Sequence, residues 1–204
     1  NLGVAGVGFV GPYPVIAIND SPLQGFFPLL KRVVDIIGAL FGLLFLSPLM
    51  LLLAGLLVMS GTRKIIYKQR RMGLDGSEFD ILKFITMKEK CEALSGPIWA
   101  SPNDSRVTKL GRILRKYNLD ELPQFVNVLK GEMSLVGPRP ERPVFVNKFR
   151  KDIPGYMLRH KVKAGMTGWA QVNGLRGQTS LPKRISYDLY YINNWSFCFN
   201  NLIR

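Results

Sequence analysis

The sequence holds few of the residue types that build metal centres and histidine-based active sites. Its 204 residues include one histidine, His160, and two cysteines, Cys91 and Cys198. A single histidine excludes any catalytic scheme that needs two. Because the cysteines lie far apart and form no Cys-x-x-Cys pair, a disulfide framework and a cysteine-based zinc site are both disfavoured. A reducing compartment is the simplest interpretation.

Acidic residues are also scarce. The chain has 14 Asp and Glu against 28 Lys and Arg, a formal charge of +14, while 47% of its residues are hydrophobic. That apolar content excludes a disordered basic tail. The positive excess indicates a polyanionic partner: nucleic acid, phosphorylated small molecules or an anionic membrane surface. A nucleic-acid module is disfavoured, because the chain lacks a basic face with interleaved aromatic residues.

What the sequence does have is a long apolar run. No charged residue occurs between Ile36 and Thr62. As a helix, at about 1.5 Å per residue, this run would be roughly 40 Å long, more than a ~30 Å hydrocarbon core. It begins too late and is too long for a signal peptide. We therefore predict that it inserts into a membrane.

The manner of insertion has two interpretations. Pro48 lies near the middle of the run, where proline costs ~3 kcal/mol or more, and the Ser47 hydroxyl can bond to a freed carbonyl one turn earlier. Both flanks are basic, with Lys31 and Arg32 before the run and a cluster at 63–71 after it. Because Lys and Arg favour the cytoplasmic side, a helix that dips in, bends at Ser47-Pro48 and returns explains both flanks. A kinked helix that spans the bilayer is equally compatible with the sequence alone.

The remaining chain predicts a small α+β domain, mostly helical. Residues 1–30 are rich in glycine and proline and are interpreted as a linker, residues 31–62 as the membrane helix, and residues 63–204 as a cytoplasmic domain. The periodicity predicts strands at 65–67 and 79–82 around a turn at 73–76, and helices near 110–117, 120–130, 142–151 and 183–195.

Asp120 and Glu121 form an adjacent carboxylate pair before Leu122-Pro123. One interpretation is structural: Asp120 caps a helix that begins there, and Glu121 sits in the first turn, favoured by the helix dipole. The other is chemical, because adjacent carboxylates can ligate Mg²⁺ and one of them can attack an electrophile. Arg112 and Arg115, on the preceding turns, could then hold phosphate oxygens nearby.

Two further patterns suit phosphate. The turn Gly137-Pro138-Arg139-Pro140 presents one arginine on a rigid loop, which is either a preorganised phosphate contact or a structural turn with a solvated side chain. The segments 161–168 and 174–177 are rich in glycine and basic residues, which suits the approach of a phosphate to backbone amides. Neither segment is a dinucleotide or Walker fingerprint.

Three long motifs occur in one order: Leu119–Gln124, Asn127–Pro140 and Lys163–Gly174. Together with Lys31-Arg32, Asp35 and Ser47-Pro48, they resemble the bacterial sugar transferases, which are monotopic polyprenyl-phosphate phosphoglycosyl transferases. The resemblance covers about four fifths of the chain. It is greatest to the large exopolysaccharide and O-antigen initiating members, which carry an additional N-terminal region.

The resemblance implies a fold and a reaction. The apolar run would be a re-entrant helix broken at Ser47-Pro48, so that both ends are cytoplasmic at the bacterial inner membrane. Asp120 and Glu121 would be the catalytic dyad and would bind Mg²⁺. Asp120 would attack the β-phosphate of a UDP-sugar, UMP would leave, and undecaprenyl phosphate would attack the phosphosugar-aspartyl intermediate.

The resemblance also implies the substrate contacts. Lys31, Arg32 and the 63–71 cluster would meet anionic membrane lipids, and no nucleic acid is expected. Glucose or galactose is the family-level sugar, and both a monomer and a homodimer stay open. A catalytically inert membrane scaffold is the alternative, against which the intact dyad argues. One expected cation is missing, because Ile85 stands where the family usually has a basic residue. Phosphate, nucleotide or supporting contacts are assigned to Lys83, Arg115, Pro138, Arg139, Arg176 and Asp188.

Overall fold

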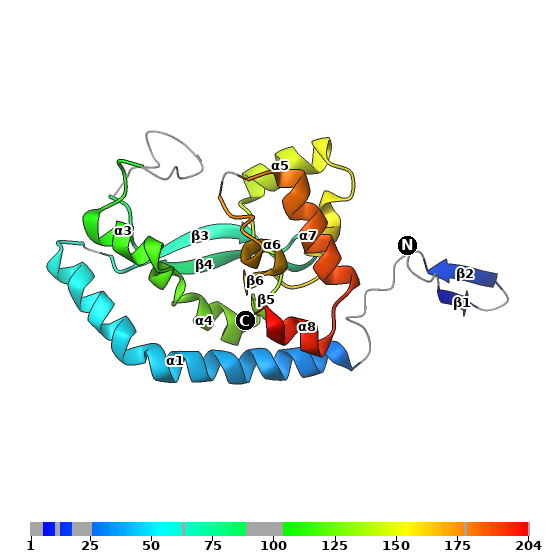
Figure 1. The fold of residues 1–204 in the computed structure, drawn as a ribbon, viewed down its shortest axis with the longest axis horizontal. Helices are drawn as coiled ribbons and strands as arrows, with labels where there is room; N and C mark the ends of the chain where they lie inside the picture. Colours follow the sequence, from blue (N-terminus) through cyan, green and yellow to red (C-terminus); the bar gives the residue numbers. More distant parts are fainter. Residues whose placement is uncertain are drawn as a thin grey trace.

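The computed structural model describes residues 6–10, 13–17, 26–62, 64–88, 104–177 and 179–203. In this part of the chain, helices predominate and the strands pair into two-stranded sheets, which confirms the α+β class (Figure 1). The strands are β1 (Gly6–Val10), β2 (Tyr13–Ala17), β3 (Ile66–Met72), β4 (Glu78–Phe84), β5 (Ser134–Val136) and β6 (Gly165–Thr167). The α-helices are α1 (Phe27–Met59), α3 (Lys109–Lys116), α4 (Gln124–Lys130), α5 (Pro143–Asp152), α6 (Trp169–Val172), α7 (Leu181–Asn193) and α8 (Phe197–Leu202). The 3-10 helices are η1 (Leu74–Gly76), η2 (Leu119–Glu121) and η3 (Tyr156–His160).

The apolar run forms helix α1, which starts four residues before the predicted boundary at residue 31. Pro48 lies inside it, and the Ser47 hydroxyl donates to the Leu44 carbonyl over 2.8 Å, as predicted. This bond satisfies a carbonyl in the turn that proline disrupts. Figure 1 shows α1 along one edge of the molecule, with its cyan C-terminal part bent away from the line of its first half.

The two faces of α1 have different environments. One face packs against the globular domain through Ala39 in the first half and Leu53 and Leu57 in the second. The other face is exposed and apolar over the whole length of the helix. Its large side chains include Val33, Ile37, Leu40, Phe41, Leu44, Phe45, Leu51 and Leu52. The helix is long and apolar enough to cross a membrane, and its exposed face fits membrane association.

A buried polar network fixes the first half of α1. The Lys31 ammonium donates to the Ser134 hydroxyl and, over 3.0 Å, to the Val136 carbonyl, and it lies 3.6 Å from the Asp35 carboxylate. Asp35 in turn accepts from the Leu135 backbone N–H over 3.0 Å. The prediction that Lys31 meets lipid headgroups is therefore wrong, because its charge is satisfied inside the protein.

Arg32 has a similar internal role. Its guanidinium donates to the carbonyls of Val128 and Leu129 over 2.6 and 2.8 Å. These carbonyls belong to the last turn of α4, and that of Val128 also accepts from the Gly131 N–H over 3.0 Å. Gly131 ends α4 in a left-handed conformation with a φ of 85°. Arg32 thus caps α4 and ties it to α1.

The predicted hairpin is confirmed, with longer strands than expected. β3 and β4 pair antiparallel from Ile66↔Phe84 to Met72↔Glu78. The turn between them includes Asp75, with a φ of 50°. Alternate β4 residues Phe79 and Ile81 enter the core below the sheet. Lys83 continues that alternation, so the same face of β4 that makes the core also carries a cation.

The glycines at 137, 165 and 168 serve backbone packing. β5 and β6 pair in parallel, with Ser134 opposite Gly165. A β-carbon on Gly165 or Gly168 would overlap the backbone of Gly137. The hypothesis that the 161–168 segment cradles a phosphate is therefore wrong for these glycines, which bring two strands together.

The helix predictions are confirmed except at one boundary and at three short elements. α3, α5 and α7 match the predicted segments within two residues at each end. The helix expected from Asp120 begins only at Gln124, because η2 and a turn intervene. The short helices α6, α8 and η3 were not predicted. The predicted linker contains the β1–β2 hairpin. Of the two cysteines, Cys198 has a free, exposed thiol, and Cys91 lies outside the described residues.

The Lys31–Asp35 pair gives a test of how α1 is docked. Asp35→Ala should lower the free energy of unfolding by about 3–5 kcal/mol, because it leaves a buried ammonium uncompensated. The double variant Lys31→Met/Asp35→Leu should lose less, since no buried charge is left unpaired. Chemical denaturation in detergent micelles measures both. A double variant that is less stable than Asp35→Ala would contradict this account.

Candidate active site

Helix α3 and a left-handed turn place the carboxylate pair. Thr108 caps α3, accepting from the Gly111 N–H over 2.9 Å. After α3 ends, Asn118 adopts a φ of 55°, which asparagine tolerates better than most residues. The chain then enters η2, which contains Asp120 and Glu121 and packs against β4. Asp120 makes no capping bond to α4, so the structural interpretation of this residue is wrong.

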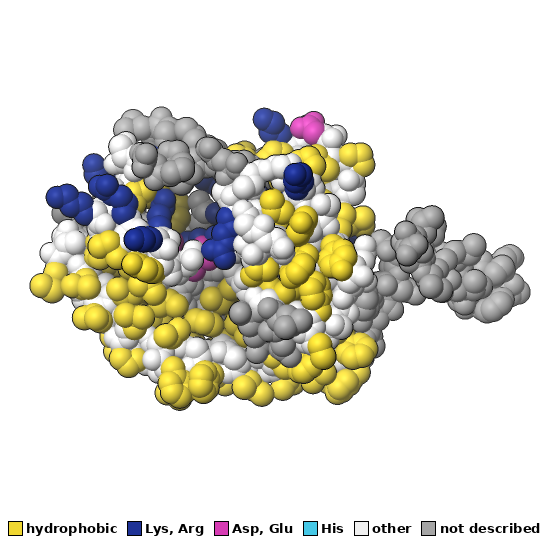
Figure 2. Space-filling view, in the orientation of Figure 1, with side chains coloured by type: hydrophobic (Ala, Val, Ile, Leu, Met, Phe, Trp, Pro, Cys, Tyr) yellow, Lys and Arg dark blue, Asp and Glu magenta, His cyan; other side chains and the backbone are white. Residues whose placement is uncertain are grey.

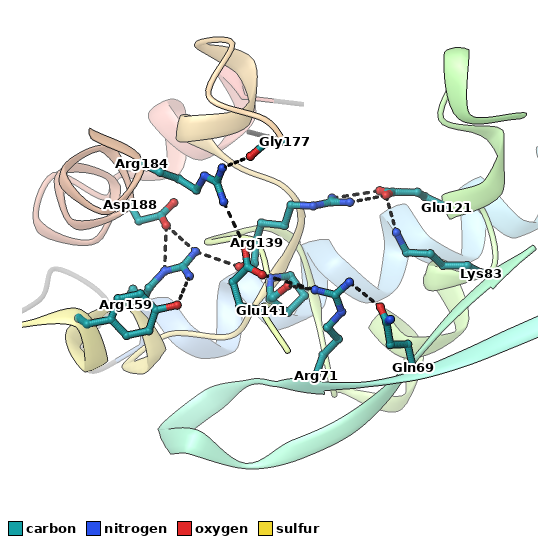
Figure 3. A network of polar contacts seen from close by, with 12 residues as sticks. Gln69, Arg71, Lys83, Glu121, Arg139, Glu141, Arg159, Gly177, Arg184 and Asp188 are labelled. Carbon is teal, nitrogen blue, oxygen red and sulfur yellow. Dashed lines mark hydrogen bonds and ion pairs between the residues drawn. The ribbon is translucent and has the colours of Figure 1, made fainter. Parts of the chain in front are cut away.

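The Glu121 carboxylate is shared by two cations from different parts of the chain (Figure 3). Its Oε1 lies 2.7 Å from the Lys83 ammonium and 2.5 Å from Nη2 of Arg139, and its Oε2 accepts from Nη1 of Arg139 over 3.2 Å. Burial raises the pKa of Glu121, but Arg139 and Lys83 outweigh it and hold that pKa well below its usual range. Glu121 is therefore an ionised, immobilised carboxylate.

Asp120 has a different environment. Its side chain is buried, and no cation lies within ion-pair distance of it among the described residues. Burial raises the pKa of Asp120; the charges of Lys83 and Arg115 oppose this shift, while Glu121 adds to it. The two adjacent carboxylates therefore differ: Glu121 is neutralised by direct ion pairs, whereas Asp120 has no ion pair among the described residues and is acted on by the charges of Lys83 and Arg115.

Two of the predicted cations lie around this pair. Nε of Arg115 donates to the Thr86 hydroxyl over 2.8 Å, and its charge acts on Asp120. Arg176 is exposed, with Nη1 3.5 Å from Oδ1 of Asn118, two residues before Asp120. Figure 2 shows an acidic side chain at the bottom of a hollow with Lys and Arg side chains around it. The structure therefore brings Lys83, Arg115, Arg139 and Arg176 to one site.

The predicted residues Pro138 and Asp188 lie behind the site rather than in it. Pro138 is buried, and its carbonyl accepts from the Gly165 N–H over 2.9 Å. Asp188 is 2% exposed and pairs with Arg159 over 2.6 Å. Both are covered by protein, so their predicted contact with substrate finds no support here, and the supporting role expected of Asp188 fits its position.

The site also depends on buried arginines and an acid that the sequence did not single out. Glu141 lies 3.1 Å from Arg184 and 3.6 Å from Arg71, and both arginines are largely buried. The prediction that the whole basic cluster at 63–71 meets headgroups is wrong for Arg71, whose charge faces Glu141 inside the protein. The scarcity of acids is the one signal in the sequence, because buried charges in proteins are generally paired. Which arginine pairs with which acid depends on contacts far apart in sequence.

His160 is not placed to act as a base. It is buried against Tyr156, with ring centroids 5.8 Å apart. Burial and the neighbouring Arg159 lower the pKa of His160 to about 4. The imidazole is therefore neutral, and it lies under the loop that carries Arg139 rather than beside the carboxylates.

The donor set of the pair fits magnesium. The described residues contain no cluster of three or more His, Cys, Asp or Glu side chains suited to a metal. Mg²⁺ does not require one, because it commonly binds through one or two carboxylates and completes its shell with water and substrate phosphates. Asp120, whose carboxylate has no ion pair among the described residues, and Glu121 next to it are the residues that would hold it.

Known proteins are similar to this chain over nearly its whole length. The family described as bacterial sugar transferase matches residues 26–203. The UDP-glucose:undecaprenyl-phosphate glucose-1-phosphate transferase of Escherichia coli (strain K12) is 46% identical over 193 residues, 92% of this chain and 41% of that protein. The UDP-N-acetylgalactosamine-undecaprenyl-phosphate N-acetylgalactosaminephosphotransferase of Aeromonas hydrophila is 42% identical over 92% of this chain and 44% of its own length.

A shorter relative matches along most of its own length. The exopolysaccharide production protein PSS of Rhizobium leguminosarum bv. phaseoli is 40% identical over 174 residues, 82% of this chain and 87% of that protein. By contrast, the chain spans about two fifths of the length of the E. coli and Aeromonas proteins. The shared region contains the Asp120–Glu121 pair and the cations around it. The chain belongs to the bacterial sugar transferase family.

Proposed function

We propose that this chain transfers a sugar 1-phosphate from a UDP-sugar to undecaprenyl phosphate, with release of UMP. The observation that carries the proposal is the buried Asp120, whose carboxylate has no ion-pair partner among the described residues and faces the charges of Lys83 and Arg115. The names of the relatives agree with a reaction between a UDP-sugar and this lipid phosphate. The reaction would be the first membrane step in the synthesis of an exopolysaccharide, capsule or O-antigen.

The first displacement forms a covalent intermediate. A carboxylate oxygen of Asp120 attacks the β-phosphorus of the UDP-sugar, and the bond from that phosphorus to the oxygen bridging the two phosphates breaks. UMP leaves with the bonding electrons, and the sugar phosphate stays on Asp120 as a mixed anhydride. An anion attacks an anion in this step, so positive groups must neutralise the developing charge.

The second displacement regenerates the enzyme. A phosphate oxygen of undecaprenyl phosphate attacks the same phosphorus, and the bond to Asp120 breaks. The carboxylate is restored and the product is the lipid diphosphate sugar. Splitting the transfer in this way lets one set of cations serve two acidic substrates in turn.

The cations around the pair would stabilise the negative charges of the substrates. Arg139, on its rigid loop, and Lys83 can turn from Glu121 toward the phosphates of the donor, while Arg115 and Arg176 lie where the negative substrate enters. Magnesium, held by Asp120 and Glu121, would supply Lewis-acid neutralisation of the diphosphate. Ile85 adds no cation, so Lys83 is the basic side chain that this end of β4 contributes.

The two named relatives differ in their sugar. The E. coli protein is named for UDP-glucose and is 46% identical, and the Aeromonas protein is named for UDP-N-acetylgalactosamine and is 42% identical. We propose UDP-glucose as the donor of this chain. A screen of UDP-glucose, UDP-galactose and their N-acetyl forms, with UMP release as the readout, tests this assignment.

We also propose that α1 enters and leaves the membrane on one face. The support is geometric: Lys31 and Asp35 near its start and Leu53 and Leu57 near its end all pack against the same globular domain. A helix that crossed the bilayer would carry one of its ends away from that domain. The exposed apolar face between these contacts is the part that would lie in lipid.

Asp120→Asn should abolish turnover. The amide is a poor nucleophile, so UMP release should fall by about 10⁴-fold or more, as for other covalent catalysts that lose their nucleophile. Wild-type protein incubated with UDP-sugar alone should gain the mass of a sugar phosphate on the peptide that contains Asp120. Asp75→Asn is the matched control, since Asp75 is exposed, pairs with Lys161 and has a φ that asparagine tolerates. Full activity of Asp120→Asn would sink the nucleophile assignment, whereas wild-type protein that releases no UMP would favour the inert scaffold.

Removal of divalent cations tests the magnesium proposal. Treatment with EDTA should stop UMP release, and added Mg²⁺ should restore it. Glu121→Gln should raise the Mg²⁺ concentration needed for half-maximal activity, because one anionic oxygen ligand is lost. Turnover that is indifferent to EDTA would contradict a metal requirement.

Cysteine labelling tests the path of α1. With Cys91 and Cys198 replaced by serine, single cysteines at Leu30 and Lys64 should react with a membrane-impermeant maleimide from the same side of oriented vesicles. Labelling from opposite sides would show that α1 spans the bilayer instead.

A further inference from the structure

Residues 138–141 form the loop that carries Arg139, and we call them the Arg139 loop. All four of its backbone carbonyls are hydrogen-bonded. Each carbonyl accepts a hydrogen bond from a different position in the chain. In chain order, the bonds are Gly165 N–H to Pro138 O (2.9 Å), Arg159 Nη2 to Arg139 O (2.9 Å), Arg71 Nη1 to Pro140 O (3.1 Å) and Met72 N–H to Glu141 O (2.9 Å).

Two of these four donors are guanidinium groups, and both are themselves fixed. Arg159 has 1% of its side chain exposed and pairs with Asp188 through Nη2 at 2.6 Å and Nε at 3.0 Å. Arg71 donates to Gln69 over 2.5 Å and lies 3.6 Å from Glu141. Figure 3 shows Arg159 and Asp188 on one side of the loop, Arg71 and Gln69 on the other, and the Arg139 side chain extending from the loop toward Glu121. The side chain of Arg139 thus projects from a backbone that two guanidinium groups hold.

This arrangement meets a specific need of the proposed reaction. The Arg139 guanidinium donates to Glu121, an anion with which a donor phosphate must compete. If Glu121 alone fixed Arg139, the arginine would lose its position as soon as it turned to the substrate. Bonds to the backbone of the loop do not change when the Arg139 guanidinium changes partner. They therefore keep the backbone from which the side chain extends in a fixed position.

We infer that Arg159 and Arg71 are positioning residues that act on the reaction through Arg139. Arg159 holds the carbonyl of Arg139 itself, and Asp188 orients Arg159. Arg71 holds the carbonyl of the next residue, and Glu141 and Gln69 orient Arg71. Neither arginine needs to touch a substrate. The inference deepens the proposed function and rests on it for its kinetic test.

A double-mutant cycle separates positioning from general structural support. Arg159→Lys keeps a charge opposite Asp188 but loses the planar fork that reaches both Asp188 and the loop. It should lower kcat/KM for the UDP-sugar by about 10- to 100-fold, the order expected for a small misplacement of a substrate-binding group. In an Arg139→Ala background the same change should have almost no further effect, because the group that it positions is gone. The same fold-loss in both backgrounds would overturn the inference.

A second measurement does not depend on turnover. The N–H groups of Met72 and Gly165 donate to the Arg139 loop, so their exchange with deuterium reports on its rigidity. Arg159→Lys should speed exchange in the peptides that contain them. Arg106→Lys is the matched control. Arg106 also forms an ion pair, with its Nη2 2.6 Å from the Asp104 carboxylate, but it makes none of the four bonds to the Arg139 loop. Unchanged exchange in Arg159→Lys would overturn the clamp.

The outcomes distinguish this inference from the proposed function. Wild-type protein that releases no UMP from any UDP-sugar counts against the proposed function, and the exchange measurement still decides the clamp. If the wild-type protein is active but Arg159→Lys causes the same fold-loss with and without Arg139, the result counts against the positioning role and leaves the proposed function intact. If Arg159→Lys does not fold, Arg71→Lys takes its place in the same cycle and exchange measurement, with the same expected results.

Discussion

The bifurcated ion pair of Glu121 is the interaction on which the site depends. Its carboxylate joins β4 through Lys83, η2 through its own backbone and the Arg139 loop through the guanidinium. The acid also separates two like charges, because Lys83 and Arg139 would repel each other without it. The same pairing neutralises Glu121 and leaves the adjacent Asp120 as the carboxylate without an ion pair among the described residues. One residue therefore both assembles the site and separates the roles of the two acids.

A second constraint is the position of α1. Polar bonds from Lys31, Arg32 and Asp35 fix its first half, and apolar contacts of Leu53 and Leu57 fix its second. The apolar face that remains exposed therefore runs beside the catalytic domain rather than away from it. If α1 lies in the membrane as proposed, its docking would hold the catalytic domain at the membrane surface, where the phosphate of the proposed lipid substrate is found.

The chain also shows how a large positive charge is distributed in a folded protein. Part of the +14 excess lies in the interior, where Arg71, Arg159 and Arg184 pair with Glu141 and Asp188. Another part serves backbone carbonyls, as Arg32 does for α4. Only the remainder, around the carboxylate pair and on exposed surfaces, is available to phosphates. Net charge therefore indicates the chemistry of the partner but does not identify which side chains meet it.

Local patterns in the sequence determined much of this protein. The apolar run, the Ser47 hydroxyl bond before Pro48, the β3–β4 hairpin, the helix faces and the Asp120–Glu121 motif all follow from the spacing and type of neighbouring residues. The family motifs pointed to Lys83, Arg115, Arg139 and Arg176, which the structure brings to one site. Tertiary structure alone decided that Lys31 and Arg71 are buried rather than at headgroups, that Asp188 lies behind the site, and that Arg159 and Arg71 bond to the Arg139 loop. The physical reason is the same in each case. A charged side chain looks alike in sequence whether water or a buried acid satisfies it, and the distinction arises only when residues far apart in the chain come into contact.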